Sequence, residues 1–359
     1  MPNSQLDKAF KALERAQELN PQEPAVEMAL ALIYGSLGQE AQLDAALDRA
    51  LALLQEWLPM HLHDALAYYN RGLIYQISRR YEDARLDFQL ALQENPNLLI
   101  AYMSLAQVEG ELGHFSQASD TLWRGIKLAE ESGVNPAWAY MNLAIIEEKA
   151  QEFSRARAAF QRAVELAPQD PWMFHYYAAF LESRQELDAA LLAYQSLAQV
   201  AQDRAWGYSQ LADFYKKRGM FEEMAGAYRQ AVHEDPDNGE LHYLLAVTYL
   251  ELGQPDQALF SFDQAASLGR LAPERYGDYA NLLYSIGSYE RAIELYQRVL
   301  EQTPASWPAL TNMAQAQLAL GACQEAVAIY TSVLERPELF ADEQRAVAQS
   351  ELERLNSCK

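Results

Sequence analysis

Residues 205–238 have the sequence AWGYSQLADFYKKRGMFEEMAGAYRQAVHEDPDN, and this stretch decides the fold. Residues 65–98, ALAYYNRGLIYQISRRYEDARLDFQLALQENPNL, have the same residue types at the same spacings. In both, an aromatic residue is followed by a small residue four positions later and by a tyrosine three positions after that. An aromatic residue, an alanine and a closing proline follow. Similarity of a chain to itself at a period of about 34 residues indicates repeated helical hairpins.

The spacing also explains how one repeat packs. Positions i, i+4 and i+7 share a helix face, so Tyr68, Gly72 and Tyr75 form a stripe in which the small Gly72 lets a neighbouring helix approach closely. The first helix is predicted to end at a glycine in the left-handed conformation, at Gly113, Gly219, Gly253, Gly287 or Gly321. The second is predicted to end at a proline, at Pro96, Pro168, Pro236 or Pro304.

The pattern resembles the tetratricopeptide repeat, and this resemblance covers nearly the whole chain. It implies an all-α fold, a right-handed superhelical solenoid of antiparallel helix pairs. We expect an N-terminal partial repeat helix over residues 1–23, about nine units over 24–340, and a C-terminal capping helix and tail over 341–359. The units are predicted to start near residues 24, 65, 99, 137, 171, 205, 239, 273 and 307.

Two insertions interrupt the period. Residues 55–64 contain EWLPMHLHD, and residues 131–136 are ESGVNP. Each predicts a longer loop or an extended helix, with a binding loop as the alternative.

Composition narrows the class of partner. The net charge is −22, which repels phosphate backbones and anionic lipid and favours basic partners, so we expect no nucleic acid. The first residues show no signal-peptide pattern, and no apolar run is long enough to span a membrane. Cys323 and Cys358 are too few for a disulfide framework and suit a reducing compartment. We therefore expect a cytoplasmic protein; its oligomeric state and partner stay open.

The family resemblance implies that the first helices of the pairs line a concave groove. By register, the predicted partner-binding residues are Tyr69, Asn70, Met103, Trp138, Met141, Asn142, Trp172, His175, Tyr176, Trp206, Gln210, Asp213, Tyr243, Asp278, Asn281, Tyr284 and Asn312. Trp138, Trp172 and Trp206 stand at equivalent places in successive repeats and form a predicted ladder. They are either binding anchors or residues that seal the core between repeats. Asn70, Asn142 and Asn312 share one offset and could pair with a peptide backbone.

The sequence offers little chemistry for catalysis. The segment His61-Leu62-His63-Asp64 is a weak candidate for a divalent metal site, and we predict no metal and no cofactor. Single acidic residues are expected on solvated helix faces, and the adjacent Glu147 and Glu148 point in different directions. The chain contains no Gly-rich phosphate loop, no HExxH and no GxSxG motif, so we expect no catalytic residues and no enzyme.

The predicted function is a non-catalytic scaffold or adaptor that binds a protein or peptide segment in its groove. An acidic and aromatic groove suits a segment in which lysine or arginine alternates with apolar residues. The alternative is an assembly factor for a membrane or photosynthetic complex, possibly with metal binding through an acidic surface.

Overall fold

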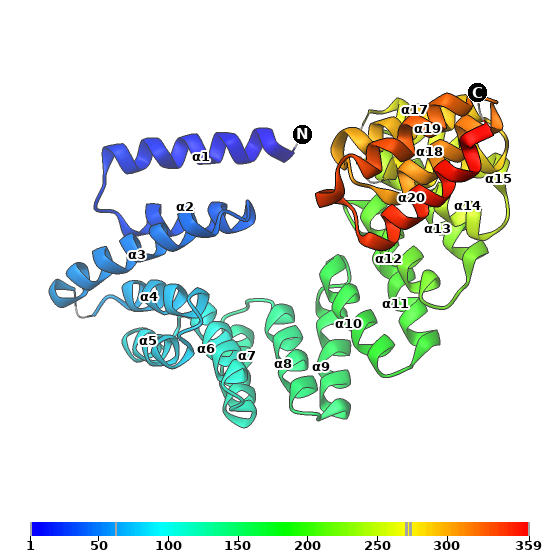
Figure 1. The fold of residues 1–359 in the computed structure, drawn as a ribbon. Helices are drawn as coiled ribbons and strands as arrows, with labels where there is room; N and C mark the ends of the chain where they lie inside the picture. Colours follow the sequence, from blue (N-terminus) through cyan, green and yellow to red (C-terminus); the bar gives the residue numbers. More distant parts are fainter. Residues whose placement is uncertain (1, 62, 270–271, 273–274, 358–359) are drawn as a thin grey trace. The chain divides into compact units, whose positions relative to one another are not determined.

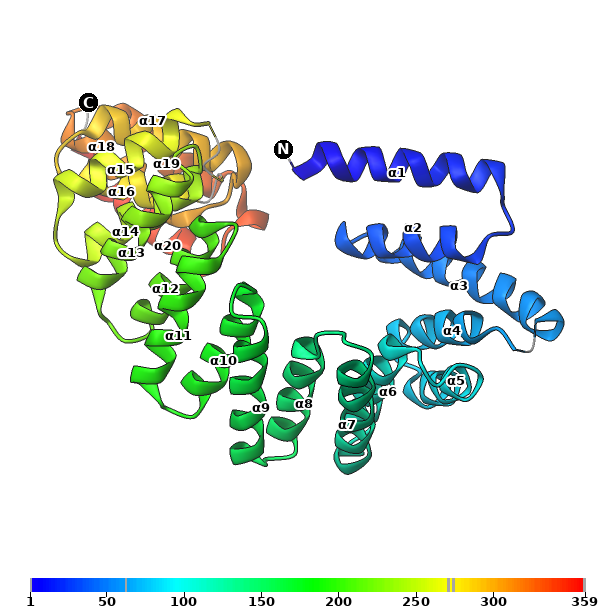
Figure 2. The same cartoon turned by 180° about the vertical axis from the view of Figure 1, so that it is seen from behind.

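The computed structural model describes residues 2–61, 63–269, 272 and 275–357, and these are helical, with no strand among them (Figure 1). Two compact units divide the chain, residues 1–180 and residues 181–359, here called the N-terminal unit and the C-terminal unit. Within each unit, consecutive helices pair through short turns (Figure 2). The described helices include none that is both long and apolar enough to cross a membrane.

The helices of the N-terminal unit are α1 (Pro2–Leu19), α2 (Pro24–Ser36), α3 (Glu40–Trp57), η1 (Leu58–Met60), α4 (Ala65–Ile77), α5 (Tyr81–Glu94), α6 (Leu99–Glu111), α7 (Phe115–Glu131), α8 (Ala137–Lys149), α9 (Phe153–Leu166) and most of α10 (Pro171–Ser183). The first helices of its pairs are therefore α2, α4, α6, α8 and α10.

The helices of the C-terminal unit are α11 (Leu187–Val200), α12 (Arg204–Lys216), α13 (Phe221–Glu234), α14 (Gly239–Glu251), α15 (Pro255–Ser267), α16 (Tyr276–Ser285), α17 (Tyr289–Gln302), α18 (Trp307–Ala319), α19 (Cys323–Leu334), η3 (Pro337–Leu339), α20 (Asp342–Arg354) and η4 (Leu355–Ser357). The expected unit start at Pro273 lies outside the described residues.

The core consists of the predicted stripes of aromatic and small residues. A Cβ atom on Gly72 would lie 2.7 Å from the ring of Phe88, which is fully buried. Only glycine therefore lets α4 approach α5 so closely, as the pattern predicted. The second-helix aromatics Phe160, Tyr194 and Tyr296 are likewise buried.

The turns inside the pairs confirm the role of glycine and add an exception. The five predicted glycines all have positive φ, from 66° to 79°. Arg79, Gln151 and Gln185 occupy the equivalent turn in three other repeats, with φ of 56°, 63° and 62°. The packing of the two helices therefore imposes the left-handed turn even where the side chain disfavours it.

Both insertions extend a second helix. Helices α3 and α7 contain 18 and 17 residues, whereas α5 and α9 contain 14 each. After α7, the Asn135 side chain donates a hydrogen bond to the Leu166 carbonyl oxygen at 2.8 Å and fixes the connection against the end of α9. This confirms the extended-helix interpretation for α7, whereas after α3 the insertion also forms the turn η1 before α4 begins.

Helix α20 packs against the last helix pair. Ala348 of α20 and Leu355 of η4 join one buried cluster with Tyr330 of α19. Cys323, the first residue of α19, is disulfide-bonded, so the expectation that it stays reduced is wrong for this structure. Cys358 lies outside the described residues.

Candidate functional site

The first helices of the N-terminal unit border a hollow surface, which we call the inner groove. One cavity of about 550 Å³ is bounded chiefly by α2, α4 and α6, and another of about 310 Å³ by α6, α8 and Tyr176 of α10. The two cavities share Gln107 and Glu111 of α6, so the groove continues from one to the other. Its lining includes Leu32, Leu73, Ile77, Trp138, Ile145 and Tyr176.

The structure places the predicted partner-binding residues in three classes of exposure. Exposed side chains are Trp138, Trp172, Tyr176, Asp213, Asp278 and Asn281; partly buried ones are Asn70, Met103, Asn142, His175, Trp206, Gln210, Tyr284 and Asn312. Tyr69, Met141 and Tyr243 are buried. Met141 nevertheless lines the inner groove, but the burial of Tyr69 and Tyr243 differs from the expectation that all of the predicted residues line a surface.

The buried tyrosines bridge successive first helices instead. The Tyr69 hydroxyl lies 3.3 Å from Ser104 Oγ, and the Tyr243 hydroxyl donates to Asp278 Oδ2 at 2.6 Å. Their buried rings consequently pack between successive first helices, and their hydroxyl groups contact polar side chains of the next one. Burial raises the pKa of Tyr243 to about 12, and its hydrogen bond to the Asp278 carboxylate acts in the same direction.

The exposed aromatic residues of the N-terminal unit favour binding over sealing of the core. Trp138 is 43% exposed and Trp172 is 44% exposed. The Trp172 ring lies beside His175 and Tyr176, with ring centroids 5.6 Å and 6.2 Å away. Partial burial lowers the pKa of His175, which favours its neutral form within this group. Trp206, in the C-terminal unit, is partly buried.

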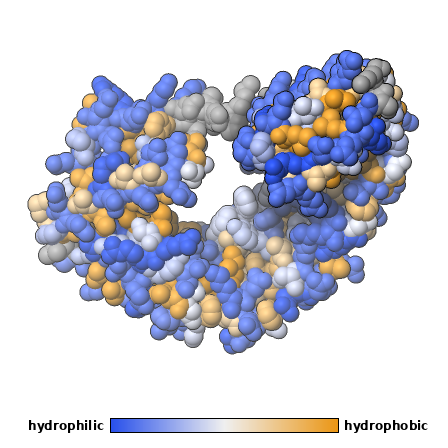
Figure 3. Space-filling model, viewed as in Figure 1, coloured by the Kyte–Doolittle hydropathy of each residue, from blue (hydrophilic) through white to orange (hydrophobic). Residues whose placement is uncertain are grey.

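The groove of the N-terminal unit is less acidic than predicted. Its exposed acid, Glu111, accepts a hydrogen bond from Lys149 Nζ at 2.6 Å, so the two charges offset one another. The Asn142 side chain donates to the Trp138 carbonyl oxygen at 2.8 Å, which occupies part of the predicted amide ladder. The remaining lining is mainly apolar, and Figure 3 shows orange hydrophobic residues between blue hydrophilic ones on one face of the molecule.

In the C-terminal unit, tyrosines of the second helices hold polar residues of the first helices. The Tyr228 hydroxyl donates to Asp213 at 3.3 Å, and the Tyr296 hydroxyl donates to Asn281 Oδ1 at 2.7 Å. In the last pair, Gln315 donates to the Tyr330 hydroxyl at 3.5 Å. The polar partner stands 15 residues before the tyrosine in each case.

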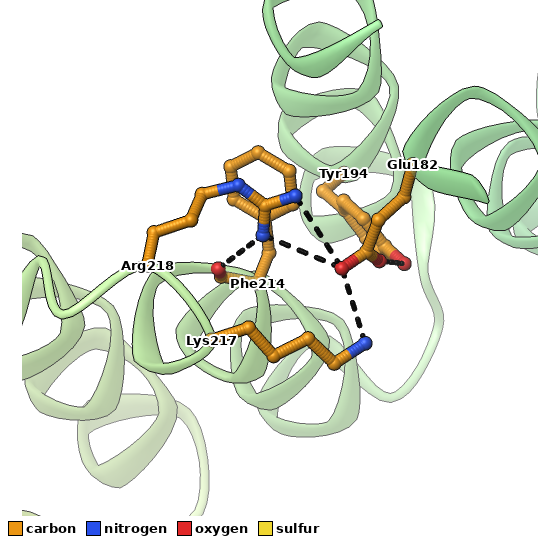
Figure 4. A network of polar contacts seen from close by, with 5 residues as sticks. All are labelled: Glu182, Tyr194, Phe214, Lys217 and Arg218. Carbon is orange, nitrogen blue, oxygen red and sulfur yellow. Dashed lines mark hydrogen bonds and ion pairs between the residues drawn. The ribbon is translucent and has the colours of Figure 1, made fainter. Parts of the chain in front are cut away.

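A related contact joins three helices at the start of the C-terminal unit (Figure 4). Glu182 of α10 accepts hydrogen bonds from the Tyr194 hydroxyl at 2.9 Å, from Lys217 Nζ at 3.1 Å and from Arg218 at 3.3 Å. The Arg218 guanidinium also stacks 3.6 Å above the Phe214 ring. Burial alone would raise the pKa of Glu182, but these hydrogen bonds and the two cations outweigh it and lower the pKa.

The candidate metal segment does not assemble a site. His61 stacks on Trp57 with ring centroids 3.9 Å apart, whereas His63 pairs with Glu94 at 2.7 Å. Leu62 lies outside the described residues. Across the described part of the chain, no three histidine, cysteine or acidic side chains are grouped so that they could hold a metal ion.

Sequence reasoning missed two kinds of residue. Leu32, which is 66% exposed, lines the groove at the position that Leu73 occupies one repeat later, so the register could have found it. Acidic side chains expected on solvated faces are instead buried at Glu27, Asp87, Glu109 and Glu147. The burial of Glu147 could have been predicted from its position in the repeat, because Tyr75 and Tyr215 occupy the same core position in other repeats.

Comparisons with known proteins agree on the repeat. Models described as tetratricopeptide repeat match residues 65–98, 137–170, 215–282 and 283–349, together more than half of the chain. A search of curated proteins finds no match.

Several solved structures are similar at low identity. The C-terminal part of a TPR repeat-containing protein from Cytophaga hutchinsonii has a TM-score of 0.49 at 12% identity, over 68% of this chain and 99% of that one. Yeast Tom70 has a TM-score of 0.38 at 15% identity, over 99% of this chain and 93% of that one. YrrB, described as a TPR protein with an unusual peptide-binding site, has a TM-score of 0.36 at 19% identity, over 50% of this chain and 91% of that one. The assignment of the repeat rests on the family models, since these TM-scores are too low to add to it.

Proposed function

The chain belongs to the tetratricopeptide repeat family, and we propose that it is a non-catalytic scaffold that binds a segment of another protein in the inner groove. The observation that carries this proposal is the continuous hollow over α6, α8 and α10, with Trp138 and Tyr176 at its edge. Large aromatic side chains that remain partly exposed lose little conformational entropy when a partner covers them.

The chemistry of the lining defines the kind of segment. In the N-terminal unit, Glu111 and Lys149 neutralise one another and the rest of the lining is mainly apolar, so this part suits apolar side chains. In the C-terminal unit, Asp213 and Asp278 are exposed at groove positions and suit lysine or arginine. The inner groove of the N-terminal unit therefore suits an apolar segment, and the exposed acids of the C-terminal unit, taken by itself, suit a basic one.

Side chains rather than an amide ladder direct this recognition. The Asn142 amide donates to a carbonyl oxygen of its own helix, and the Asn312 amide donates to Asn281 Oδ1 at 2.9 Å. Amides already engaged in this way offer fewer donors to a peptide backbone. Trp138, Tyr176 and the apolar floor then contribute most of the binding free energy.

The proposal is tested with Trp138→Ala on the full chain. Peptides are selected from a random displayed library against the unaltered protein, and their affinities are measured by fluorescence anisotropy. Trp138 is 43% exposed, so a partner could bury about 100 Å² more of it, worth up to about 2.5 kcal/mol at about 25 cal/mol per Å². We expect the variant to bind about 10- to 70-fold more weakly.

Trp57→Ala is the matched control, because Trp57 is 40% exposed but does not line the inner groove. It should leave the affinities unchanged, and both variants should keep the far-UV helical signal. The proposal fails if the selected peptides bind the Trp138 variant as tightly as the unaltered chain, or if the control weakens them equally. If the affinities do not weaken at high salt, the selected peptides do not depend on lysine or arginine, and the proposed preference for basic residues is wrong.

A further inference from the structure

A second cavity lies on the other side of α8, away from the inner groove. Helix α8 lies between α7 and α9 in both ribbon views (Figures 1 and 2). The cavity, which we call the outer cavity, has a volume of about 690 Å³, within the range of ligand pockets in proteins. Its lining comes from α7, α8, the turn after α8, and α9: Phe115, Ser116, Ser119, Asp120, Trp123, Tyr140, Leu143, Glu147, Ala150, Glu152, Arg155, Ala158 and Ala159.

The two faces of α8 explain why the cavities are separate. Trp138, Met141, Ile145 and Lys149 line the inner groove at spacings of three, four and four residues, and Asn142 lies beside them. Tyr140, Leu143 and Glu147 share the opposite helix face and line the outer cavity. Small side chains on α7 and α9 leave the space between these helices open.

Glu147 is the unusual residue of the outer cavity. Its side chain is only 6% exposed, and one carboxylate oxygen accepts a hydrogen bond from Ser119 Oγ at 2.9 Å. Within the described residues, the other oxygen has no hydrogen-bond donor, and the nearest cation, the Arg155 guanidinium, is 4.0 Å away. The Arg155 side chain is itself 72% exposed, so water screens its charge.

Burying a carboxylate that has only one neutral hydrogen-bond donor costs folding free energy. The repeat fold does not require an acid at this position. The equivalent stripe position holds Tyr215 and Tyr249 in later repeats, where both rings are buried. A cation that entered the outer cavity would supply the missing partner of Glu147. The exposed carboxylates of Asp120 and Glu152 lie at the same cavity, so acids outnumber the one base that lines it.

Aromatic rings form the adjacent wall. The rings of Trp123 and Tyr140 are perpendicular, at 90°, with centroids 5.8 Å apart. Trp123 remains 50% exposed, so its face is accessible. Two rings at right angles next to a carboxylate favour an organic cation, because each π face attracts positive charge and covers the apolar stem.

We propose that the outer cavity is a second binding site, which takes a lysine or arginine side chain of a partner protein. The cationic head pairs with the Glu147 oxygen that Ser119 does not contact, and the apolar stem lies against Trp123 and Tyr140. A scaffold with sites on both faces of α8 could hold two partners, or two parts of one partner, at once. This site does not depend on what binds in the inner groove.

The test uses the full chain labelled with 5-fluorotryptophan and 19F NMR. The chain contains six tryptophans, and Trp123→Phe assigns the Trp123 resonance. The probes are Nα-acetyl-lysine amide and Nα-acetyl-arginine amide, with Nα-acetyl-norleucine amide as the neutral counterpart. At least one cationic probe should shift the Trp123 resonance in a saturable manner, and norleucine should not.

Substitutions then identify the partner of the cation. Glu147→Gln keeps a hydrogen-bond acceptor for Ser119 but removes the negative charge. It should weaken binding of the cationic probe by about tenfold or more. Glu148→Gln, one residue away, is the matched control and should have no effect, because Glu148 does not line the outer cavity. Asp120→Asn, on the exposed rim, should weaken binding less than Glu147→Gln and provides a second test if Glu147→Gln disturbs the fold.

The Arg155→Gln variant tests whether the outer cavity binds a positive charge. Arg155 is the only base that lines the outer cavity as described, so removing it should tighten binding of the cationic probe. Weaker cation binding in this variant would contradict the electrostatic basis of the site and overturn the proposal. The proposal also fails if neither cationic probe moves the Trp123 resonance, if norleucine moves it equally, or if Glu147→Gln and Glu148→Gln behave alike.

Discussion

Glu182 should contribute measurably to the stability of the C-terminal unit. Its side chain is 16% exposed and that of Arg218 is 17% exposed, so their ion pair is largely shielded from water. Hydrogen bonds to charged groups contribute about 1.5–3 kcal/mol each, whereas the Lys217 ammonium, on a side chain that is 63% exposed, adds little. Glu182→Ala should therefore lower the free energy of unfolding by about 2–3 kcal/mol.

The effect should also depend on pH. The folded state holds the pKa of Glu182 below its ordinary value, so the carboxylate stabilises the fold above the unfolded pKa of about 4.5. This stabilisation is lost as pH falls through the lower, folded pKa. Glu182→Gln cannot lose a charge, so its stability should change less between pH 7 and pH 3 than that of the unaltered chain.

Urea unfolding at several pH values measures both effects, and hydrogen exchange locates them. Because a repeat array is stabilised by neighbouring interfaces, amide protection should fall most in α10, α11 and α12. Asp237→Asn, which removes an exposed carboxylate from the same unit, is the control. The reasoning is refuted if Glu182→Ala costs less than about 0.5 kcal/mol, or if the glutamine variant retains the full acid dependence.

Two further predictions concern the turns and the buried tyrosines. Gln185→Gly should raise the free energy of unfolding in urea by about 1 kcal/mol, because φ is 62° at this residue and glycine adopts it without strain. The same change at Gln195, inside α11, should lower the free energy of unfolding by about 1 kcal/mol. Burial raises the pKa of Tyr243 and Tyr296 to about 12, so stability should be complete below about pH 10 and fall as pH rises toward 12. Tyr296→Phe should flatten this alkaline dependence, which stability measured at pH 9 and pH 11 would check.

The repeat fold was predictable because its signal is repeated. Any one stripe, such as Tyr68, Gly72 and Tyr75, could arise by chance, but copies in a single register constrain one another. A pattern shared by many repeats does not show where a single repeat departs from it. The left-handed turn at Gln185 could not be inferred from the residue, since only the neighbouring helices impose that conformation.

The groove was predictable in position but not in charge. Register alone placed Trp138 and Tyr176 on the groove side of their helices, since both depend on helical spacing. Net charge could not show that Glu111 pairs with Lys149, because this contact joins residues 38 positions apart. Ion pairs between helices depend on side-chain geometry that the repeat pattern does not specify.

In three helix pairs of the C-terminal unit, a buried tyrosine of the second helix contacts a polar residue of the first helix 15 positions earlier, as in Tyr228 with Asp213 and Tyr296 with Asn281. Tyr194 differs, because its partner Glu182 stands 12 positions earlier. Where the second-helix residue is Phe262, which has no hydroxyl, the earlier position holds Val247. Leaving a buried hydroxyl without a partner costs free energy, so in these pairs we expect the two positions to change together. A change to the groove floor that is meant to alter partner choice therefore requires the matching change in the core, and Asn281→Val should be tolerated better together with Tyr296→Phe than alone.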